Sequence, residues 1–173
     1  MMTQENGIRT HTNALRVNSH HEVLIKAPAE AIFPLACPVG ELKWIDNWRF
    51  DLIYSESGVN ENNCIFTEEM SSPVLFQTGG KIYWHTTLHD REEQRIHFLL
   101  ISEGKSLMKW EASFEEREKG STRVHWNVTL TSLSDEVDRI GERQLQERLF
   151  AIISFLGEAL KHYCETGEML KRG

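Results

Sequence analysis

Residues 108–130, MKWEASFEEREKGSTRVHWNVTL, decide the fold. Large apolar residues stand at every second position on both sides of Glu118-Lys119-Gly120, which predicts two antiparallel strands joined by a short hairpin loop. Pairing Arg117 with Ser121 brings the apolar side chains together on one face, in the pairs Phe114–Val124, Ala112–Trp126, Trp110–Val128 and Met108–Leu130. A slip of one residue would turn half of this set toward water, so the pattern specifies its own register.

Similar alternation in the preceding part of the chain predicts a larger antiparallel sheet. The segments with strand patterns are residues 16–27, 50–57, 64–69, 81–88 and 95–102. Residues 71–80 are expected to form a loop. Together with the first hairpin, these segments give a curved antiparallel sheet of about six to seven strands with one apolar face.

A second hairpin is expected around residues 90–94, where polar residues separate two alternating segments. Its register, continued from the loop, places Leu88 opposite Ile96 and Thr86 opposite Phe98. Both pairs then lie on the apolar face of the sheet.

The helical patterns lie at the two ends of this sheet. Two short helices are expected after the first strand, over residues 29–36 and 40–47. The chain then ends in a long helical pattern over residues 135–166 that either crosses the molecule or breaks near Gly141. Its apolar stripe consists of Leu145, Leu149, Ile152, Ile153, Leu156, Leu160 and Tyr163. A one-sided sheet needs a cover, and only this helix is long enough, so the fold class is α+β.

The ends of that helix have recognisable signals. Ser134 is the expected N-cap, because its hydroxyl can accept a hydrogen bond from a free backbone N–H of the first turn. Gly167 is the expected C-cap, because glycine adopts the left-handed conformation that ends many helices.

The composition disfavours several classes of partner. The 173 residues carry 19 Lys and Arg against 26 Asp and Glu, a net charge of −7, which argues against nucleic acids and anionic membranes. Cys37, Cys64 and Cys164 suggest neither a disulfide framework nor a zinc site. We therefore expect a cytoplasmic protein, a monomer or homodimer, with a disordered tail over residues 1–15 and one domain over residues 16–170.

The aromatic residues suggest where a ligand could bind. The chain has five Trp and eight Phe, and a curved sheet that grips a helix tends to leave a space between them. Two interpretations stay open, because such rings can form a solid core or line a pocket for a small hydrophobic molecule. In the second, Thr86 would orient a ligand oxygen. The predicted ligand-binding residues are Trp44, Trp48, Trp84, Thr86, Phe98, Met108, Trp110, Trp126, Val128, Leu149, Ile153 and Leu156.

Glu41 is the candidate acid or base. It stands one helical turn before Trp44, whose indole could desolvate the carboxyl group and raise its pKa. A structural role also stays open, in which Glu41 pairs with a backbone amide or an arginine and fixes its loop. Cys37 precedes Pro38 and is interpreted as a buried structural thiol rather than a nucleophile.

The histidines do not predict a metal centre. His85 and His89 are four residues apart, but four residues of a strand span about 13 Å. The predicted register places His97 opposite Thr87, beside these two on the outer face, which gives a surface histidine patch. We expect no metal and no cofactor.

The order of elements resembles the helix-grip fold of the START-like (SRPBCC) superfamily. That superfamily includes lipid-transfer domains, polyketide cyclases, the birch pollen allergen family and heat-shock-ATPase activators, and the resemblance covers roughly residues 17–170. Residues 33–48, FPLACPVGELKWIDNW, are similar to the pattern F-P-L-x-C-P-V-x-E-x-x-W-I-x-x-W of a bacterial branch without an established reaction. The same branch has features similar to residues 53–58, 64–67 and 162–170.

This resemblance implies a fold and a pocket rather than a reaction, so three functions stay open. The preferred one is binding of a small hydrophobic or aromatic molecule between the sheet and the C-terminal helix. The second is a cyclase- or hydratase-like enzyme with Glu41 as acid or base and Thr86 or Tyr54 as orienting group. The third is a protein-interaction module like the heat-shock-ATPase activators, which would need a large exposed apolar or charged patch.

Overall fold

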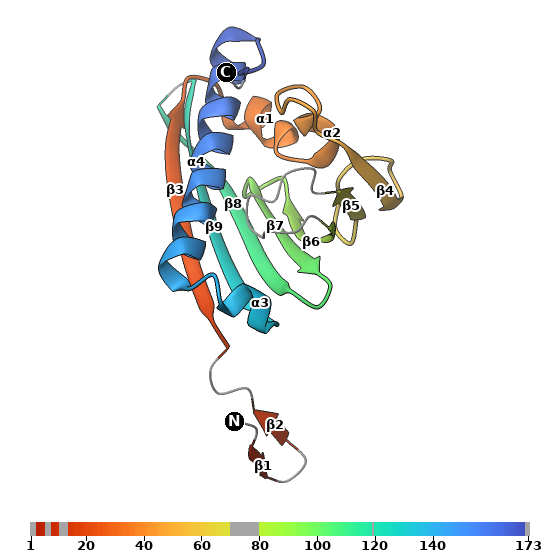
Figure 1. Ribbon diagram of the computed structural model, residues 1–173. Coiled ribbons are helices and arrows are strands. Elements are labelled where there is room, and N and C mark those ends of the chain that lie inside the picture. Colours follow the sequence, from red (N-terminus) through yellow and green to blue (C-terminus); the bar gives the residue numbers. More distant parts are fainter. Residues whose placement is uncertain (1–2, 6–7, 11–13, 70–79, 119, 172–173) are drawn as a thin grey trace.

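The computed structural model describes residues 3–5, 8–10, 14–69, 80–118 and 120–171. A seven-stranded antiparallel sheet curves around a long C-terminal helix (Figure 1), in the strand order β3-β9-β8-β7-β6-β5-β4. The strands are β3 (Arg16–Ile25), β4 (Phe50–Tyr54), β5 (Ile65–Glu69), β6 (Lys81–Asp90), β7 (Arg95–Ser102), β8 (Ser106–Glu118) and β9 (Ser121–Ser132). The predicted α+β class and helix-grip arrangement are confirmed.

Short helices follow β3, as predicted. They are α1 (Ala29–Ile32), a 3₁₀ turn η1 (Phe33–Leu35) and α2 (Pro38–Glu41). The second helix was expected over residues 40–47, and this boundary is wrong. Pro38 starts the helix earlier, because proline fits the first helical turn, where its missing N–H is not needed.

The long helical pattern breaks at Gly141, one of the two expected outcomes. It divides into α3 (Asp135–Asp138) and α4 (Glu142–Thr166), and Gly141 has a φ of 85° between them. Both predicted caps are confirmed. Ser134 accepts a hydrogen bond from the Val137 N–H, and Gly167 is left-handed.

The register of the β8–β9 hairpin agrees with the sequence pattern in its apolar part. Phe114 pairs with Val124 and Trp110 with Val128, as predicted. The pairing at the tip is wrong, because a bulge between Glu116 and Glu118 makes Glu118, not Arg117, the partner of Ser121. The extra residue is absorbed at the hairpin end, where it leaves the buried face unchanged.

A second bulge changes the β6–β7 pair. Thr86 lies opposite Phe98 as expected, but Leu88 pairs with His97 rather than with Ile96, and His89 pairs with Ile96. The bulge therefore reverses the facing of the residues that follow it.

This reversal breaks up the expected histidine patch. His89 now shares the inner face with Ile96, and its ring lies 5.0 Å from the ring of Phe33. His97 stays on the outer side, next to Glu111. The prediction that His85, His89 and His97 lie together is thus wrong, because the bulge inserts one residue between them.

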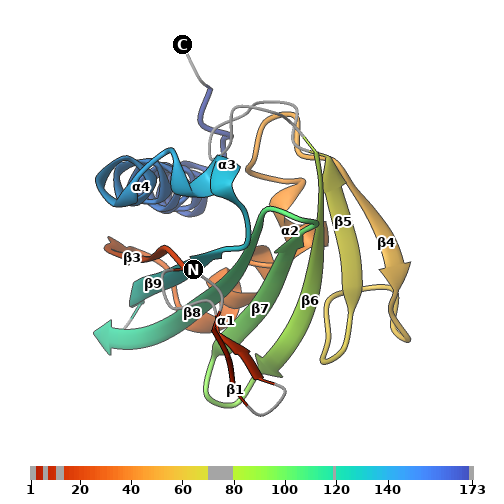
Figure 2. The ribbon, with the colours of Figure 1, turned by 60° about the horizontal axis from the view of Figure 1, so that its bottom comes forward.

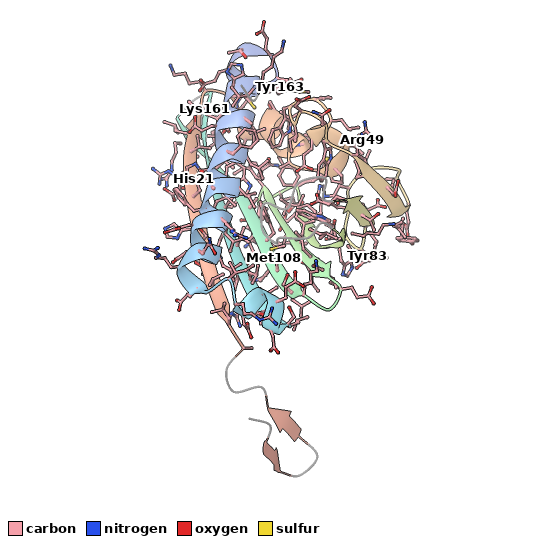
Figure 3. All side chains as sticks on the ribbon, in the orientation of Figure 1. His21, Arg49, Tyr83, Met108, Lys161 and Tyr163 are labelled. Carbon is pink, nitrogen blue, oxygen red and sulfur yellow. The ribbon has the colours of Figure 1, made fainter. Side chains whose placement is uncertain are left out.

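Helix α4 lies along the edge strand β3 (Figure 2). Lys161, labelled in Figure 3, donates a hydrogen bond to the Leu24 carbonyl of β3 at 2.7 Å, and Gln146 donates one to the Asn18 carbonyl at 3.0 Å. A Cβ added at Gly157 would lie 2.9 Å from a ring carbon of His21. The helix therefore sits against β3, while the sheet curves away from it toward β6.

Two regions remain, the N-terminal tail over residues 1–15 and the expected loop over residues 71–80. In the tail, β1 (Thr3–Glu5) pairs with β2 (Ile8–Thr10), a hairpin that the sequence analysis did not anticipate, and this pair forms a sheet of its own. The expected loop at 71–80 falls outside the described residues, except for Gly80. Within the described part of the chain, no helix is both long and apolar enough to cross a membrane.

A substitution at Gly40 tests how closely α2 is packed against η1. A Cβ at Gly40 would overlap the Pro34 carbonyl oxygen and lie 2.7 Å from the Leu35 Cα, and backbone atoms cannot rotate away. We expect Gly40→Ala to lower the free energy of unfolding by about 2 kcal/mol, measured by urea denaturation. Gly80→Ala is the control, since its Cβ would meet nothing within 4 Å, and it should be neutral or slightly stabilising. Equal stability of the two variants would contradict the close packing.

Candidate functional site

A cavity of about 180 Å³ lies among residues of α4, of strands β5 to β9 and of the segment that follows η1. Its walls are mainly aromatic and aliphatic. Met108 of β8, labelled in Figure 3, lines it on the sheet side, and Leu156 lines it from α4. For comparison, an engineered cavity of about 150 Å³ in another protein binds benzene. The space therefore has the size of a molecule with one ring or a compact pair of rings.

Most of the predicted ligand-binding residues line this cavity. The structure brings together Trp44, Trp48, Trp84, Phe98, Met108, Trp110, Trp126 and Leu156. Other lining residues were not among those predicted, and they include Ile45, Ile82, Ile96, Leu100 and Ala112. Alternation did place Ile82, Ile96, Leu100 and Ala112 on the inner face, so their signal was present in the strand pattern.

Four predicted residues do not line the cavity. Thr86, Val128, Leu149 and Ile153 are all completely buried in the core. They were expected there because they share a face with residues that do line it. Strand and helix periodicity identify the inner face, but they do not tell where on that face the helix touches the sheet.

Two anchored indoles form one end of the cavity. The Trp44 indole N–H donates a hydrogen bond to the Leu35 carbonyl at 2.8 Å. The Trp48 indole N–H donates one to the Pro38 carbonyl at 3.0 Å. Each ring is therefore held against the η1–α2 segment, with its polar atom satisfied and its apolar surface left for the cavity.

Glu41 also lines the cavity, at the last residue of α2. Its backbone carbonyl accepts hydrogen bonds from the Trp44 and Ile45 N–H groups, which places it one turn from Trp44 as predicted. Its carboxyl group makes no hydrogen bond or ion pair within the described part of the chain. Within the described residues, no amide or arginine is thus seen to hold the Glu41 carboxyl group, and its structural interpretation stays a prediction.

A second carboxyl group, that of Glu68, lies in the same cavity. Burial raises the pKa of Glu41 to about 8, and the charge of Glu68 adds to this effect. Burial also raises the pKa of Glu68 to about 7, against an opposing effect of the Trp84 indole N–H. Two carboxyl groups that share a water-poor space resist simultaneous ionisation, so the pair holds protons near neutral pH.

Glu68 was not predicted as a site residue, although its position in the strand pattern indicated an inward side chain. Glu68 stands two residues after Phe66 on β5, so both must point to the same face. In the sheet, Phe66 pairs with Trp84 and Glu68 pairs with Ile82. A glutamate near the end of a short strand is usually solvated, so Glu68 was not expected to point inward.

The described residues that line the cavity supply no counter-ion for these carboxyl groups. No Lys, Arg or His is among the described residues that line it. Residues 70–79, MSSPVLFQTG, contain no such residue either. The indole nitrogen of Trp84 is buried and makes no hydrogen bond to the described residues. Nor do any three His, Cys, Asp or Glu residues of the described ranges form a group that could hold a metal.

The other candidate groups lie away from the cavity. The Thr86 hydroxyl donates a hydrogen bond to the Asn60 side chain at 2.6 Å, and Tyr54 is 50% exposed. Neither is placed to orient a ligand as expected. The Cys37 thiol donates to the Pro34 carbonyl, and burial raises its pKa, so it stays protonated, in agreement with a structural role.

Comparison with solved structures identifies the fold. A point mutant of norcoclaurine synthase from Thalictrum flavum, in complex with a transition-state analogue, superposes with a TM-score of 0.67 at 13% identity, covering 91% of this chain and 99% of that one. A START superfamily protein from Mycobacterium smegmatis gives 0.66 at 12% identity over 87% and 99%. The Zhui aromatase/cyclase from Streptomyces sp. R1128 gives 0.65 at 9% identity over 90% and 100%.

The chain therefore has the START-like helix-grip fold, as the sequence predicted. No protein-family model and no curated protein matches its sequence. At such low identities the likeness establishes the fold alone, because this fold carries unrelated functions. What the cavity does must be argued from the residues of this chain.

The raised pKa values of Glu41 and Glu68 predict a particular pH dependence of stability. Both groups bind protons more tightly in the folded chain, so their contribution is complete below about pH 4.5 and is lost as the pH rises through 7 and 8. We expect the wild type to lose at least about 3 kcal/mol of unfolding free energy between pH 5 and 9 relative to Glu41→Gln/Glu68→Gln.

The measurement is urea denaturation of both proteins across this pH range. Glu92→Gln is the control, because Glu92 is exposed at the β6–β7 turn and does not line the cavity. It should follow the wild type at each pH. If the double variant shows the wild-type pH dependence, the two carboxyl groups do not share a desolvated space.

Proposed function

We propose that this protein binds a small, mostly aromatic molecule in the cavity between α4 and the sheet. The observation that carries the proposal is that all five tryptophans of the chain line one space. Tryptophan buries more apolar area than other side chains and prefers contact with flat rings. A random distribution of core aromatics would not bring every indole to the same cavity.

The arrangement of the rings supports this proposal. Trp84 lies at the centre of a set of ring contacts, with Phe66 stacked at 5.3 Å and Phe98 edge-on at 5.4 Å. Trp110 is tilted against it at 5.9 Å. Rings held in this way cannot easily turn into the space, so the cavity is preorganised for a guest.

The polar groups of the cavity suggest the form of the ligand. Glu41 and Glu68 supply carboxyl oxygens, and Trp84 supplies a buried indole N–H that acts on Glu68. The indole N–H groups of Trp44 and Trp48 are bonded to backbone carbonyls. The other lining side chains of the described residues are apolar, apart from the indole N–H groups of Trp110 and Trp126. A ligand with one apolar ring and one polar end matches this distribution.

A substitution that fills the cavity tests the proposal. Leu156 lines the cavity from α4, and Leu156→Trp would place an indole in the space. We expect the affinity for 4-methylphenol, measured by isothermal titration calorimetry, to fall about tenfold or more, because a guest would lose room that the indole occupies.

Glu158→Trp is the matched control. Glu158 lies on the same helix but is exposed, so the added ring should leave the affinity unchanged. If 4-methylphenol and other single-ring probes fail to bind the wild type at millimolar concentration, the proposal is overturned. The same holds if both variants bind the probe as tightly as the wild type.

Acid–base catalysis on a bound molecule is the second candidate function. It is favoured by the presence of Glu41 and Glu68 in one cavity, both with a pKa near neutral. A general acid or base works best when its pKa is close to the operating pH. The expected orienting groups, Thr86 and Tyr54, do not line the cavity, and the Trp84 indole N–H beside Glu68 offers a donor instead.

A simple proton-transfer assay tests this candidate. 1-Indanone has weakly acidic C–H bonds next to its carbonyl and fits the size of the cavity. We expect the protein to accelerate hydrogen–deuterium exchange at that carbon, followed by NMR, and Glu41→Gln to slow the exchange about a hundredfold. Glu92→Gln should exchange like the wild type. Exchange at the buffer rate in the wild type would count against catalysis by this pair.

The remaining expectations stay predictions. A protein-interaction module would need an exposed apolar patch, and the edge strand β4 has exposed apolar side chains such as Leu52 and Ile53. No further observation favours this hypothesis. A cytoplasmic location and a monomeric or dimeric state fit the proposed function as well.

A further inference from the structure

The acidic groups of the cavity indicate which kind of small aromatic molecule would bind there, and so make the proposed function more specific. Glu41 and Glu68 bring two acidic groups into a space whose other walls are rings and aliphatic chains. Neither carboxyl group makes a hydrogen bond or an ion pair to a cationic side chain of the described residues. Among the described lining residues, the site thus has acidic groups and no basic ones.

This arrangement is costly for the protein alone. A carboxylate removed from water without a counter-ion loses its solvation, and the empty site avoids this cost by holding protons. The raised pKa values of both groups agree with this description. A bound cation would supply the missing partner and allow both groups to ionise.

The aromatic walls add to the attraction for a cation. The face of an indole carries negative charge density, and tryptophan gives the strongest cation–π interaction of the natural side chains. Trp44, Trp84 and Trp110 line the same cavity as the two carboxyl groups. An acidic pair within a set of indoles is complementary to a positively charged nitrogen with apolar substituents.

We infer that the ligand of this cavity is a small organic cation, with a protonated or quaternary nitrogen attached to a single ring or a similarly compact apolar body. This inference rests on the proposed binding function. An anion would meet two acidic groups, and the donors among the described lining residues are neutral indole N–H groups. A neutral alcohol would satisfy one carboxyl group and leave the other without a partner. The net charge of −7 also favours the approach of cations.

The experiment compares three probes of nearly equal shape, benzylammonium, benzyl alcohol and benzoate, by isothermal titration calorimetry at pH 8. They differ in the charge of one polar group. We expect benzylammonium to bind at least about tenfold more tightly than benzyl alcohol. Benzoate should bind most weakly, because its carboxylate would lie beside Glu41 and Glu68.

Variants of the acidic pair show whether these residues cause the preference. Glu41→Gln and Glu68→Gln should each reduce the preference for benzylammonium over benzyl alcohol about tenfold. Retained binding of benzyl alcohol also shows that the variants are folded. Glu92→Gln, at the exposed turn, should bind all three probes like the wild type.

The outcomes separate this inference from the proposed function. If benzyl alcohol binds the wild type as tightly as benzylammonium does, the inference is overturned while ligand binding stands. The inference also fails if benzylammonium binds tightly but both Gln variants keep the full preference. If none of the three probes binds, the proposed function and the inference fail together.

Discussion

The fold depends on the contact between α4 and the edge strand β3. Carbonyl groups on the free side of β3 accept hydrogen bonds from Gln146 and Lys161, and Gly157 lets the helix backbone come close to His21. This contact covers an exposed sheet edge and fixes the helix over one side of the sheet. Neighbouring strands turn by roughly 20° each, so a sheet of seven strands curves away from a helix held at its first strand. The cavity lies in the space that results.

A gap between a helix and a sheet normally closes by side-chain repacking, so its persistence needs an explanation. A cavity of this size forgoes packing contacts worth on the order of 4 kcal/mol. Here the walls cannot collapse easily, because Trp44 and Trp48 are held by hydrogen bonds to the η1–α2 segment and Gly40 fixes that segment against Pro34. Stability is thus given up for a preformed space, which is the usual situation in a binding site and unusual in a simple core.

The alternation of apolar residues in the sequence predicted the strand pairings correctly. It did not predict the β-bulges, each of which inserts a single residue into a strand. Trp110 and Val128 pair as expected because a slip would expose a whole apolar face. The bulge between Thr86 and Leu88 left no such signal, and it turned His89 inward. Five of the predicted ligand-binding residues, Trp84, Phe98, Met108, Trp110 and Trp126, line the cavity because they share the inner face of the sheet. Glu68 was missed because the same inner-face argument was not applied to a charged residue.

The acidic pair is the part of the site that packing does not explain. Apolar residues in place of Glu41 and Glu68 would fill the same positions without the cost of buried charge, and such replacements usually stabilise a core. The fold therefore does not need these carboxyl groups, whereas a bound molecule could use them. The binding proposal and the catalysis proposal differ only in what happens to the proton that the two carboxyl groups hold. A cation would displace it, and a substrate that gives up or accepts a proton would exchange it with the pair. Both possibilities place the function of this protein at the same two side chains, enclosed by its tryptophans.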